Sequence, residues 1–207
     1  LYLPLTWIYN DLGMKNVDVV YAIIEKYHST ATFYQAYQVD GGLWLDKYTM
    51  GMAVLYFPSF LAGHFFAWAG GYVMDGFSKP YQLAIVYGSL VYSLIGIYFL
   101  RKVLLKFFNE KVSTTVLILV VLGTNYYHIA GFSYTMSHNY IFTLYAVLLY
   151  CVVCWHEKPK IRFIVWAAVT AGLAILSRPT ECVCLVILVL YGVYNKETFL
   201  FKLKLMW

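Results

Sequence analysis

Charged residues are scarce in this 207-residue chain: Asp, Glu, Lys and Arg make up 12% of it, whereas hydrophobic residues make up 62%. Soluble domains contain about 25% charged and about 45–50% apolar residues. So few charges cannot cover a water-soluble globule of this size, and so many hydrophobic residues exclude intrinsic disorder. The net charge of +5 is modest for a nucleic-acid-binding protein, so we expect no nucleic-acid partner. The composition predicts a polytopic membrane protein.

Cysteines and common catalytic motifs are also sparse. The chain has four cysteines, and they lie in apolar stretches without the context of a redox motif or the spacing of a zinc site: Cys151, Cys154, Cys182 and Cys184. Glycine-rich phosphate loops and the GxSxG and HExxH sequences are absent. We therefore expect the cysteines to pack in the core. The familiar nucleotide-binding, serine hydrolase and zinc protease signatures are excluded.

Uncharged apolar stretches predict an all-α bundle over residues 50–207, with about six transmembrane or half-spanning helices. A helix needs about 17–25 residues to cross a bilayer. The stretches are Met50–Met74, Leu83–Leu100, Val112–Gly123, Tyr140–Trp155, Phe163–Ser177 and Cys182–Tyr194. Several are too short to cross alone, and polar breaks separate them. This pattern suggests helices that end early around an internal cavity.

Three basic clusters predict which ends of these helices face the cytoplasm. They are Arg101, Lys102, Lys106 and Lys111; Lys158, Lys160 and Arg162; and Lys196, Lys202 and Lys204. The positive-inside rule places them in the cytoplasm and the segments 124–139 and 177–181 outside. If Met50–Met74 crossed once, Leu1–Lys47 would also be cytoplasmic. A break at Pro58 or Gly70-Gly71, making this segment re-entrant or two half-helices, removes the conflict, and we prefer it.

Residues 1–49 differ from the bundle and predict an external loop. Between Met14 and His28, one helical stripe carries the apolar side chains and a histidine: Val17, Val20, Tyr21, Ile24 and His28. This spacing predicts an amphipathic juxtamembrane helix that could lie on a membrane surface. Phe33–Val39 and Leu43–Tyr48 alternate around Asp40-Gly41-Gly42, which indicates a hairpin.

Two cations lie at membrane boundaries, where a lipid phosphate could bind them. Lys47 follows Asp46 directly before the first apolar stretch, and Arg178 precedes Pro179 between two apolar stretches. A charge at such depth needs a cavity, a partner or a lipid head group. The structural alternatives are a snorkelling Lys47 and a pair of Arg178 with Glu181 at a helix end.

The outward segment Thr124–Asn139 mixes aromatic, amide, hydroxyl and imidazole groups, as sugar sites do. His138 could coordinate a metal, donate to a phosphate or hydrogen-bond a sugar. The alternative is a helix cap by Ser137 or Asn139 with tyrosines at the membrane interface. His64, inside an apolar helix, is better explained by packing.

Together these features resemble the membrane glycosyltransferases of the GT-C fold, in the branch of protein O-mannosyltransferases and the lipid A aminoarabinose transferase. Leu1–Pro4 and the amphipathic helix resemble the first external loop of that family. Asp46–Gly51 resembles its acidic-Lys-Pro-Pro element, with Tyr48 and Thr49 in place of the prolines. Gly131–Asn139 resembles a loop that ends in Thr-x-Asp, and Leu173–Thr180 a helix end with Arg-Pro-Thr.

The resemblance implies transfer of a sugar from a polyprenyl-phosphate carrier to a glycan, lipid or protein acceptor at the outer face of a bacterial inner membrane. Lys47 and Arg178 would bind the lipid phosphate. The sugar and acceptor pocket would comprise Asp46, Tyr48, Tyr134, His138 and Asn139. A divalent metal could take part, with His138 as a ligand. The catalytic acid is expected before Leu1, with Asp11 and Asp18 as substitutes.

Two other functions fit parts of the sequence. A transporter or flippase-like carrier also uses broken helices and rare intramembrane charges, but usually with an internal repeat, which this chain lacks. A non-catalytic subunit of an envelope assembly would resemble a transferase without its acid. An apolar span followed by Asp or Glu upstream of Leu1 would favour the transferase.

Overall fold

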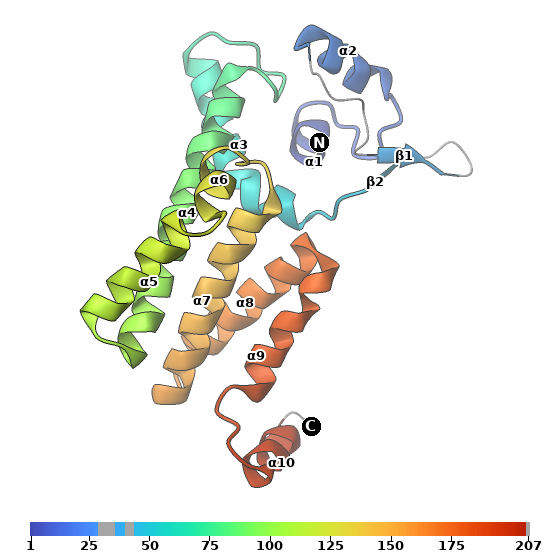
Figure 1. Cartoon of the computed structure of the whole chain (residues 1–207). Coiled ribbons are helices and arrows are strands. Elements are labelled where there is room, and N and C mark those ends of the chain that lie inside the picture. The colour runs from blue at the N-terminus through green and yellow to red at the C-terminus, as the bar shows by residue number, and fades with distance from the viewer. Residues whose placement is uncertain (29–35, 40–43, 206–207) are drawn as a thin grey trace. The chain divides into compact units, whose positions relative to one another are not determined.

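The computed structural model describes residues 1–28, 36–39 and 44–205, and the chain there is almost entirely helical (Figure 1). It divides into two compact units, Leu1–Gly88 and Ser89–Trp207. The division falls inside the long helix α4 (Lys79–Phe107), whereas the composition suggested a boundary between residues 49 and 50. Helix α3 (Gly51–Ala69), which we assigned to the membrane bundle, therefore lies in one unit with the N-terminal segment.

The first unit begins with α1 (Tyr2–Trp7), α2 (Asp18–Lys26), β1 (Ala36–Gln38) and β2 (Trp44–Asp46). The predicted amphipathic helix is confirmed as α2, although it is shorter than 14–28. Its apolar side chain Val20 is buried in a small core with Leu5, Met14 and Ala36. Val20 is thus covered by the chain itself, whereas Tyr21 of the predicted stripe is 48% exposed.

The predicted hairpin is present as two short antiparallel strands. Tyr37 pairs with Leu45, and Ala36 pairs with Asp46. Its expected turn at residues 40–42 and the start of its first strand at residues 33–35 lie outside the described residues. Trp44 packs against the core of Leu5 and Val20, so the strands and α2 belong to one small folded body.

Helix α3 (Gly51–Ala69) is continuous, so the predicted break at Pro58 is wrong. The proline ring lies on the exposed side of the helix, while the opposite side packs closely against α4. A Cβ atom at Gly88 would overlap Ser59 Oγ, and one at Gly63 would lie 2.8 Å from Tyr81 Cα. Small residues thus allow the close contact that supports the helix across Pro58. The helix ends at Gly70, before Gly71 at φ +68°, so the second of the two predicted break points, Gly70-Gly71, is present.

The second unit is a helical bundle that continues from α4. Its elements are α5 (Glu110–Leu122), α6 (Tyr126–Gly131), α7 (Ser137–Glu157), α8 (Ile161–Ser177), the 3-10 helix η1 (Pro179–Cys184), α9 (Leu185–Leu190) and α10 (Lys196–Leu205). Helices α7 and α8 lie side by side (Figure 1). Their core contains small side chains that permit this approach: Cys151, Val152, Ala167, Ala171 and Cys184.

Two predicted segments of this unit differ from the structure. The polar stretch 124–139 contains the short helix α6, which the sequence analysis placed in a loop. The apolar stretch 182–194 is divided between η1 and α9 and is too short to cross a bilayer. Both differences arise where helices of only about six residues form, because packing against longer neighbours stabilises them despite their length.

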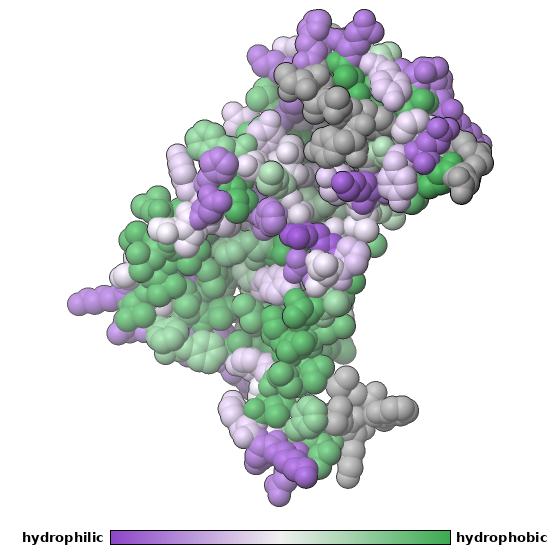
Figure 2. Space-filling view, turned by 45° about the vertical axis from the view of Figure 1, so that its right-hand side comes forward, coloured by the Kyte–Doolittle hydropathy of each residue, from purple (hydrophilic) through white to green (hydrophobic). Residues whose placement is uncertain are grey.

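Three of the described helices are long and apolar enough to cross a membrane: α3, α4 and α7. Helix α8 and the segment Pro179–Leu190 are apolar but shorter. The expectation of an all-α membrane protein is thus supported, while the expected number of about six spans is not. Many large apolar side chains are exposed on α4, including Leu90, Val91 and Leu94. Figure 2 shows a broad hydrophobic surface over the helices, as a lipid-facing bundle requires.

The basic connections meet at one end of the second unit. Lys106 at the end of α4 forms an ion pair with Glu157 at the end of α7. The ring of His156 lies 4.8 Å from that of Tyr191, which follows α9. The chain therefore brings the α4–α5, α7–α8 and α9–α10 connections to the same end, as the positive-inside rule requires of cytoplasmic loops.

Candidate functional site

The second unit carries a polar site around the cation Arg178, at the end opposite these basic connections. Helix α8 begins beside Lys160 and ends at Ser177, and Arg178 follows with extended backbone angles of φ −148° and ψ 112°. Because Pro179 disfavours helical geometry at the preceding residue, the helix must stop here. Pro179 then starts η1, and the break leaves the Arg178 side chain at the surface of the bundle, 40% exposed.

The structure brings Arg178 and His138 together, although 40 residues separate them. Arg178 Nη1 lies 3.3 Å from His138 Nδ1. Since a guanidinium can only donate, the imidazole accepts at Nδ1 and carries its proton on Nε2. His138 is the second residue of α7, where backbone amide groups lack partners within the helix. Two sequence-predicted residues thus form one donor-rich site.

A carboxylate and a phenol lie next to the Arg178–His138 pair. Arg178 Nε lies 3.8 Å from Glu181 Oε1, and the Tyr145 hydroxyl donates to Glu181 Oε2 over 2.8 Å. Glu181 is better covered than Arg178, with 17% of its side chain exposed. Its carboxylate is held by Tyr145, so the guanidinium keeps free N–H groups. The Arg178–Glu181 pair that we considered as a structural alternative is therefore present, but its N–O distance is longer than that of a direct hydrogen bond.

Such an arrangement can bind an anion. The arginine supplies charge and a planar fork that matches the oxygens of phosphate, and His138 can add an Nε2–H donor. The N-terminus of α7 adds a partial positive charge to the same place. Because the site lies beside exposed apolar helix surfaces, an anion attached to a lipid fits this environment better than a soluble one.

Asn139, which we expected in the sugar pocket, is fully buried and belongs to the helix packing. Its side chain makes four hydrogen bonds with α4 and α6. Nδ2 donates to the carbonyl oxygen of Ser89 (2.8 Å) and to Ser89 Oγ (2.9 Å), and Oδ1 accepts from Ser93 (2.9 Å) and Tyr126 (3.0 Å). All donors and acceptors of the amide are used, so Asn139 positions the start of α7 and with it the neighbouring His138.

The residues predicted around Lys47 form a turn before α3 in the first unit. Asp46 Oδ1 accepts from the backbone N–H of Tyr48 over 2.9 Å, and the Tyr48 carbonyl accepts from the Tyr2 hydroxyl over 2.8 Å. The Lys47 side chain is exposed. Asp46 and Tyr48 thus shape the turn that presents Lys47. Lys47 belongs to the first unit and Arg178 to the second.

The remaining predicted residues have local roles. The Asp11 carboxylate accepts from the backbone N–H groups of Asn16 and Lys15, which hold the pKa of Asp11 below its usual value. Asp18 begins α2 and is exposed, and Tyr134 is half-buried in the turn after α6. Among the described residues, no three His, Cys, Asp or Glu side chains lie close enough to hold a metal ion. The predicted metal at His138 stays a prediction.

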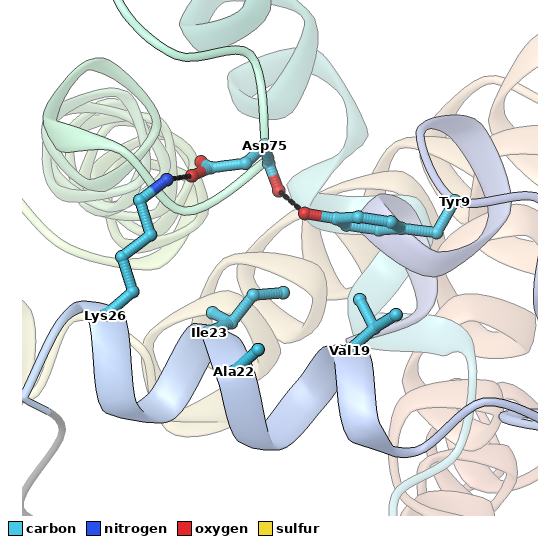
Figure 3. A pocket seen from close by; sticks show the side chains of 6 residues that line it. All are labelled: Tyr9, Val19, Ala22, Ile23, Lys26 and Asp75. Atoms are coloured by element: carbon cyan, nitrogen blue, oxygen red, sulfur yellow. Dashed lines mark hydrogen bonds and ion pairs between the residues drawn. The ribbon is translucent and has the colours of Figure 1, made fainter.

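An ion pair that the sequence analysis missed closes one end of a small open pocket in the first unit (Figure 3). Lys26 Nζ donates to Asp75 over 2.7 Å, and the Tyr27 hydroxyl donates to the same oxygen over 2.6 Å. Burial alone would raise the pKa of Asp75. These bonds, together with two backbone N–H groups, outweigh it and lower the pKa to about 2. The pocket of about 270 Å³ also has Tyr9 and apolar side chains of α2 in its wall.

The Asp75 pair has a structural role, because its charges satisfy each other. A signal for it exists in the sequence: Asp75 is an isolated acid between the apolar stretches 50–74 and 83–100. Tyr145 had no such signal, since it is one aromatic residue among many in an apolar helix. Its importance depends on the position of Glu181, which only the packing of η1 against α8 and α7 determines.

Comparison with protein-family models, with curated proteins and with solved structures gave no match to this chain. The site must therefore be interpreted from its own chemistry.

Proposed function

We propose that this chain belongs to a membrane glycosyltransferase that takes a sugar from a polyprenyl-phosphate carrier and transfers it to an acceptor at the outer face of the membrane. The observation that carries this proposal is the pairing of Arg178 with His138 at a helix break. The site lies at the end of the bundle opposite the basic connections. A lipid phosphate at the outer interface is the anion that fits this location.

In this reaction the acceptor oxygen forms a bond with the anomeric carbon of the sugar, and the bond from that carbon to the phosphate oxygen breaks. The leaving group is the polyprenyl phosphate, which gains negative charge. Arg178 stabilises this charge through its N–H groups, and His138 Nε2–H adds a second donor. A carboxylate general base takes the proton of the acceptor hydroxyl. Lys47 is proposed as a further phosphate ligand, with Tyr134 near the sugar.

Binding of a polyprenyl phosphate to the protein in lipid nanodiscs tests the phosphate site directly. Polyprenol of the same chain length is the ligand control, because it lacks only the phosphate. The Arg178→Ala variant removes the fork, and Arg178→Lys keeps the charge without it. A charge-assisted contact contributes about 1.5–3 kcal/mol, so we expect Arg178→Ala to weaken phosphate binding by about 10- to 100-fold.

The matched control is Arg162→Ala, which removes an exposed arginine near the basic end of α8 and should leave binding unchanged. Equal affinity of wild type for polyprenol and polyprenyl phosphate would show that phosphate is not recognised. A transfer assay with a polyprenyl-phosphate sugar then separates the two membrane functions. Binding without sugar transfer, but with movement of the lipid between leaflets, would support the carrier and contradict the transferase.

A further inference from the structure

The basic end of the second unit contains two kinds of cation. Arg101 and Lys106, near the end of α4, each form an ion pair with a glutamate. Lys102 of the same helix and Arg162 at the start of α8 have no carboxylate within ion-pair distance among the residues that the structure describes. The charges of Lys102 and Arg162 are therefore available for an anion from outside the chain.

Aromatic rings hold these two cations in place. Lys102 Nζ lies 4.9 Å from the centre of the Tyr98 ring and 5.9 Å from that of Tyr150 on α7. Arg162 Cζ lies 4.8 Å from the centre of the Phe163 ring. The rings of Phe163 and Tyr150 are themselves 6.4 Å apart. An aromatic face attracts a cation without neutralising it, so both side chains are positioned while their charges stay uncompensated.

Helix α7 connects the two cations, because it lies between α4 and α8 at this end of the bundle (Figure 1). Its Tyr150 contacts Phe99 of α4 on one side, with ring centres 5.2 Å apart, and Phe163 of α8 on the other. Lys102 and Arg162 therefore flank one row of aromatic side chains that three helices build. Sixty residues of sequence separate the two cations, and only this packing makes them one site.

Each cation also lies at the end of an exposed apolar stripe. The stripes consist of residues three or four positions apart, namely Val91, Leu94 and Tyr98 on α4 and Trp166 and Val169 on α8. Lys102 continues the first stripe four residues after Tyr98, and Arg162 precedes the second by four residues. Exposed apolar surface of this kind needs an apolar partner, and α4 is long and apolar enough to cross a membrane. The cations thus lie where the lipid-facing surface ends, at the depth of lipid phosphates.

We propose that Lys102 and Arg162 bind the head group of an anionic phospholipid in the cytoplasmic leaflet, with its acyl chains along the stripes of α4 and α8. Basic pockets between helices on the cytoplasmic side suit such head groups. A soluble anion would match the two charges but would leave the stripes uncovered, whereas a lipid satisfies both. A zwitterionic lipid carries a cation of its own, which the two protein cations repel.

This lipid site is separate from the proposed site for the polyprenyl phosphate. Arg178 lies at the opposite end of the bundle, whereas Lys102 and Arg162 lie among the basic connections. The inference therefore does not depend on the proposed transferase activity. It requires only that the second unit is inserted in a membrane.

Native mass spectrometry of the protein released from detergent micelles tests the proposal, because it resolves each bound lipid. The probes are phosphatidylglycerol, which has a net negative charge, and phosphatidylcholine of the same chain length. A basic residue near the membrane surface favours an anionic lipid by an amount that corresponds to about 5-fold in affinity. We expect Lys102→Ala and Arg162→Ala each to weaken binding of the first phosphatidylglycerol by about 5-fold, and neither to change phosphatidylcholine binding.

Two control variants separate a defined site from general attraction. Lys111→Ala removes an exposed cation from the same end of the bundle and should leave phosphatidylglycerol binding unchanged. Lys102→Arg keeps the charge and should bind within about 2-fold of wild type, which distinguishes a lost charge from a folding defect. Arg178→Ala should also leave phosphatidylglycerol binding unchanged, since its site is at the other end.

Three results would overturn the proposal. Equal affinity of the wild type for the two lipids would show that the anionic head group is not recognised. An equal loss in Lys111→Ala would show that net charge, and not this pair of cations, attracts the lipid. Loss of phosphatidylglycerol binding in Arg178→Ala, with Lys102→Ala unaffected, would place the lipid at the opposite end of the bundle.

Discussion

The buried amide of Asn139 offers the sharpest test of how the site is positioned. The Asn139→Ala substitution removes four hydrogen bonds that join the start of α7 to α4 and α6. It leaves the Tyr126 hydroxyl, in a residue only 8% exposed, without the acceptor it uses here. Ser93 keeps a second acceptor, the carbonyl oxygen of Ser89, over 3.1 Å. The main loss is therefore at Asn139 and Tyr126.

The magnitude follows from the number of bonds. Hydrogen bonds between membrane helices contribute about 0.6 kcal/mol on average and about 1.7 kcal/mol at most. Four of them, with one hydroxyl left buried, give an expected loss of about 2–4 kcal/mol in the free energy of unfolding. Ser93→Ala removes one of these bonds and should cost about 0.6 kcal/mol. The ratio between the two variants is a stricter test than either value.

Unfolding in mixed detergent micelles with increasing dodecyl sulfate, followed by far-UV circular dichroism, measures both variants. The matched control is Asn125→Ala, which truncates an exposed asparagine without a side-chain cap bond and should change stability by less than about 0.5 kcal/mol. A loss at Asn139 no larger than that of the Asn125 control would refute the reasoning. So would an equal loss in Ser93→Ala, because the four bonds would then not act together.

Three further predictions concern single groups. The lowered pKa of Asp75, about 2 against about 3.9 in an unfolded chain, stabilises the first unit above pH 4, and this contribution disappears as the pH falls towards 2. The wild type should lose of order 1–2 kcal/mol of unfolding free energy over that range and Asp75→Asn should not; parallel pH profiles would contradict the assignment. Glu181→Gln removes a negative charge 3.8 Å from Arg178. The variant should therefore bind polyprenyl phosphate roughly 3-fold more tightly in the nanodisc assay. Unchanged or weaker binding would contradict the assignment of Arg178 to the phosphate. Gly88→Ala should destabilise the protein by about 1–3 kcal/mol, because the added Cβ would overlap Ser59. Gly172→Ala, which has open space around it, should instead stabilise α8 by about 0.5–1 kcal/mol. Detergent unfolding measures both variants, and equal effects would refute the close packing of α3 on α4.

Much of the local structure could be predicted because it depends on neighbours in sequence. The helix over α2, the strands at Ala36–Gln38 and Trp44–Asp46, and the end of α8 before Pro179 all follow from spacing or from the geometry of proline. The continuity of α3 could not be predicted, since Pro58 usually interrupts a helix. Only its packing against α4 through Gly63 shows why the helix continues.

In the candidate site, too, some residues could be identified from sequence and others only from the packing of the helices. Arg178 could be identified from sequence, because a cation between two apolar stretches is costly without a purpose. Its neighbour Glu181 was also named as a possible partner, since it lies three residues further along the chain. His138 and Tyr145 could not be identified as partners, because they reach the site through the contact of α7 with α8 and η1. Asn139, adjacent to His138, was predicted in the sugar pocket because amide groups bind sugar hydroxyls. The helix instead directs its side chain into the bundle, where the amide makes its full set of hydrogen bonds.

Composition alone predicted a membrane protein, since 12% charged residues cannot cover a water-soluble globule of this size, and three of the described helices are long and apolar enough to cross a membrane. The positions of those charges predicted which end of the bundle is cytoplasmic. Only the tertiary structure decided how the apolar helices are used. Hydropathy is a property of a segment alone, and by this measure α3 and α7 are both apolar enough to cross a membrane. How a helix is held depends on contacts with residues distant in sequence, and the connection that follows α3 is fixed to α2 by a hydrogen-bonded ion pair between Lys26 and Asp75.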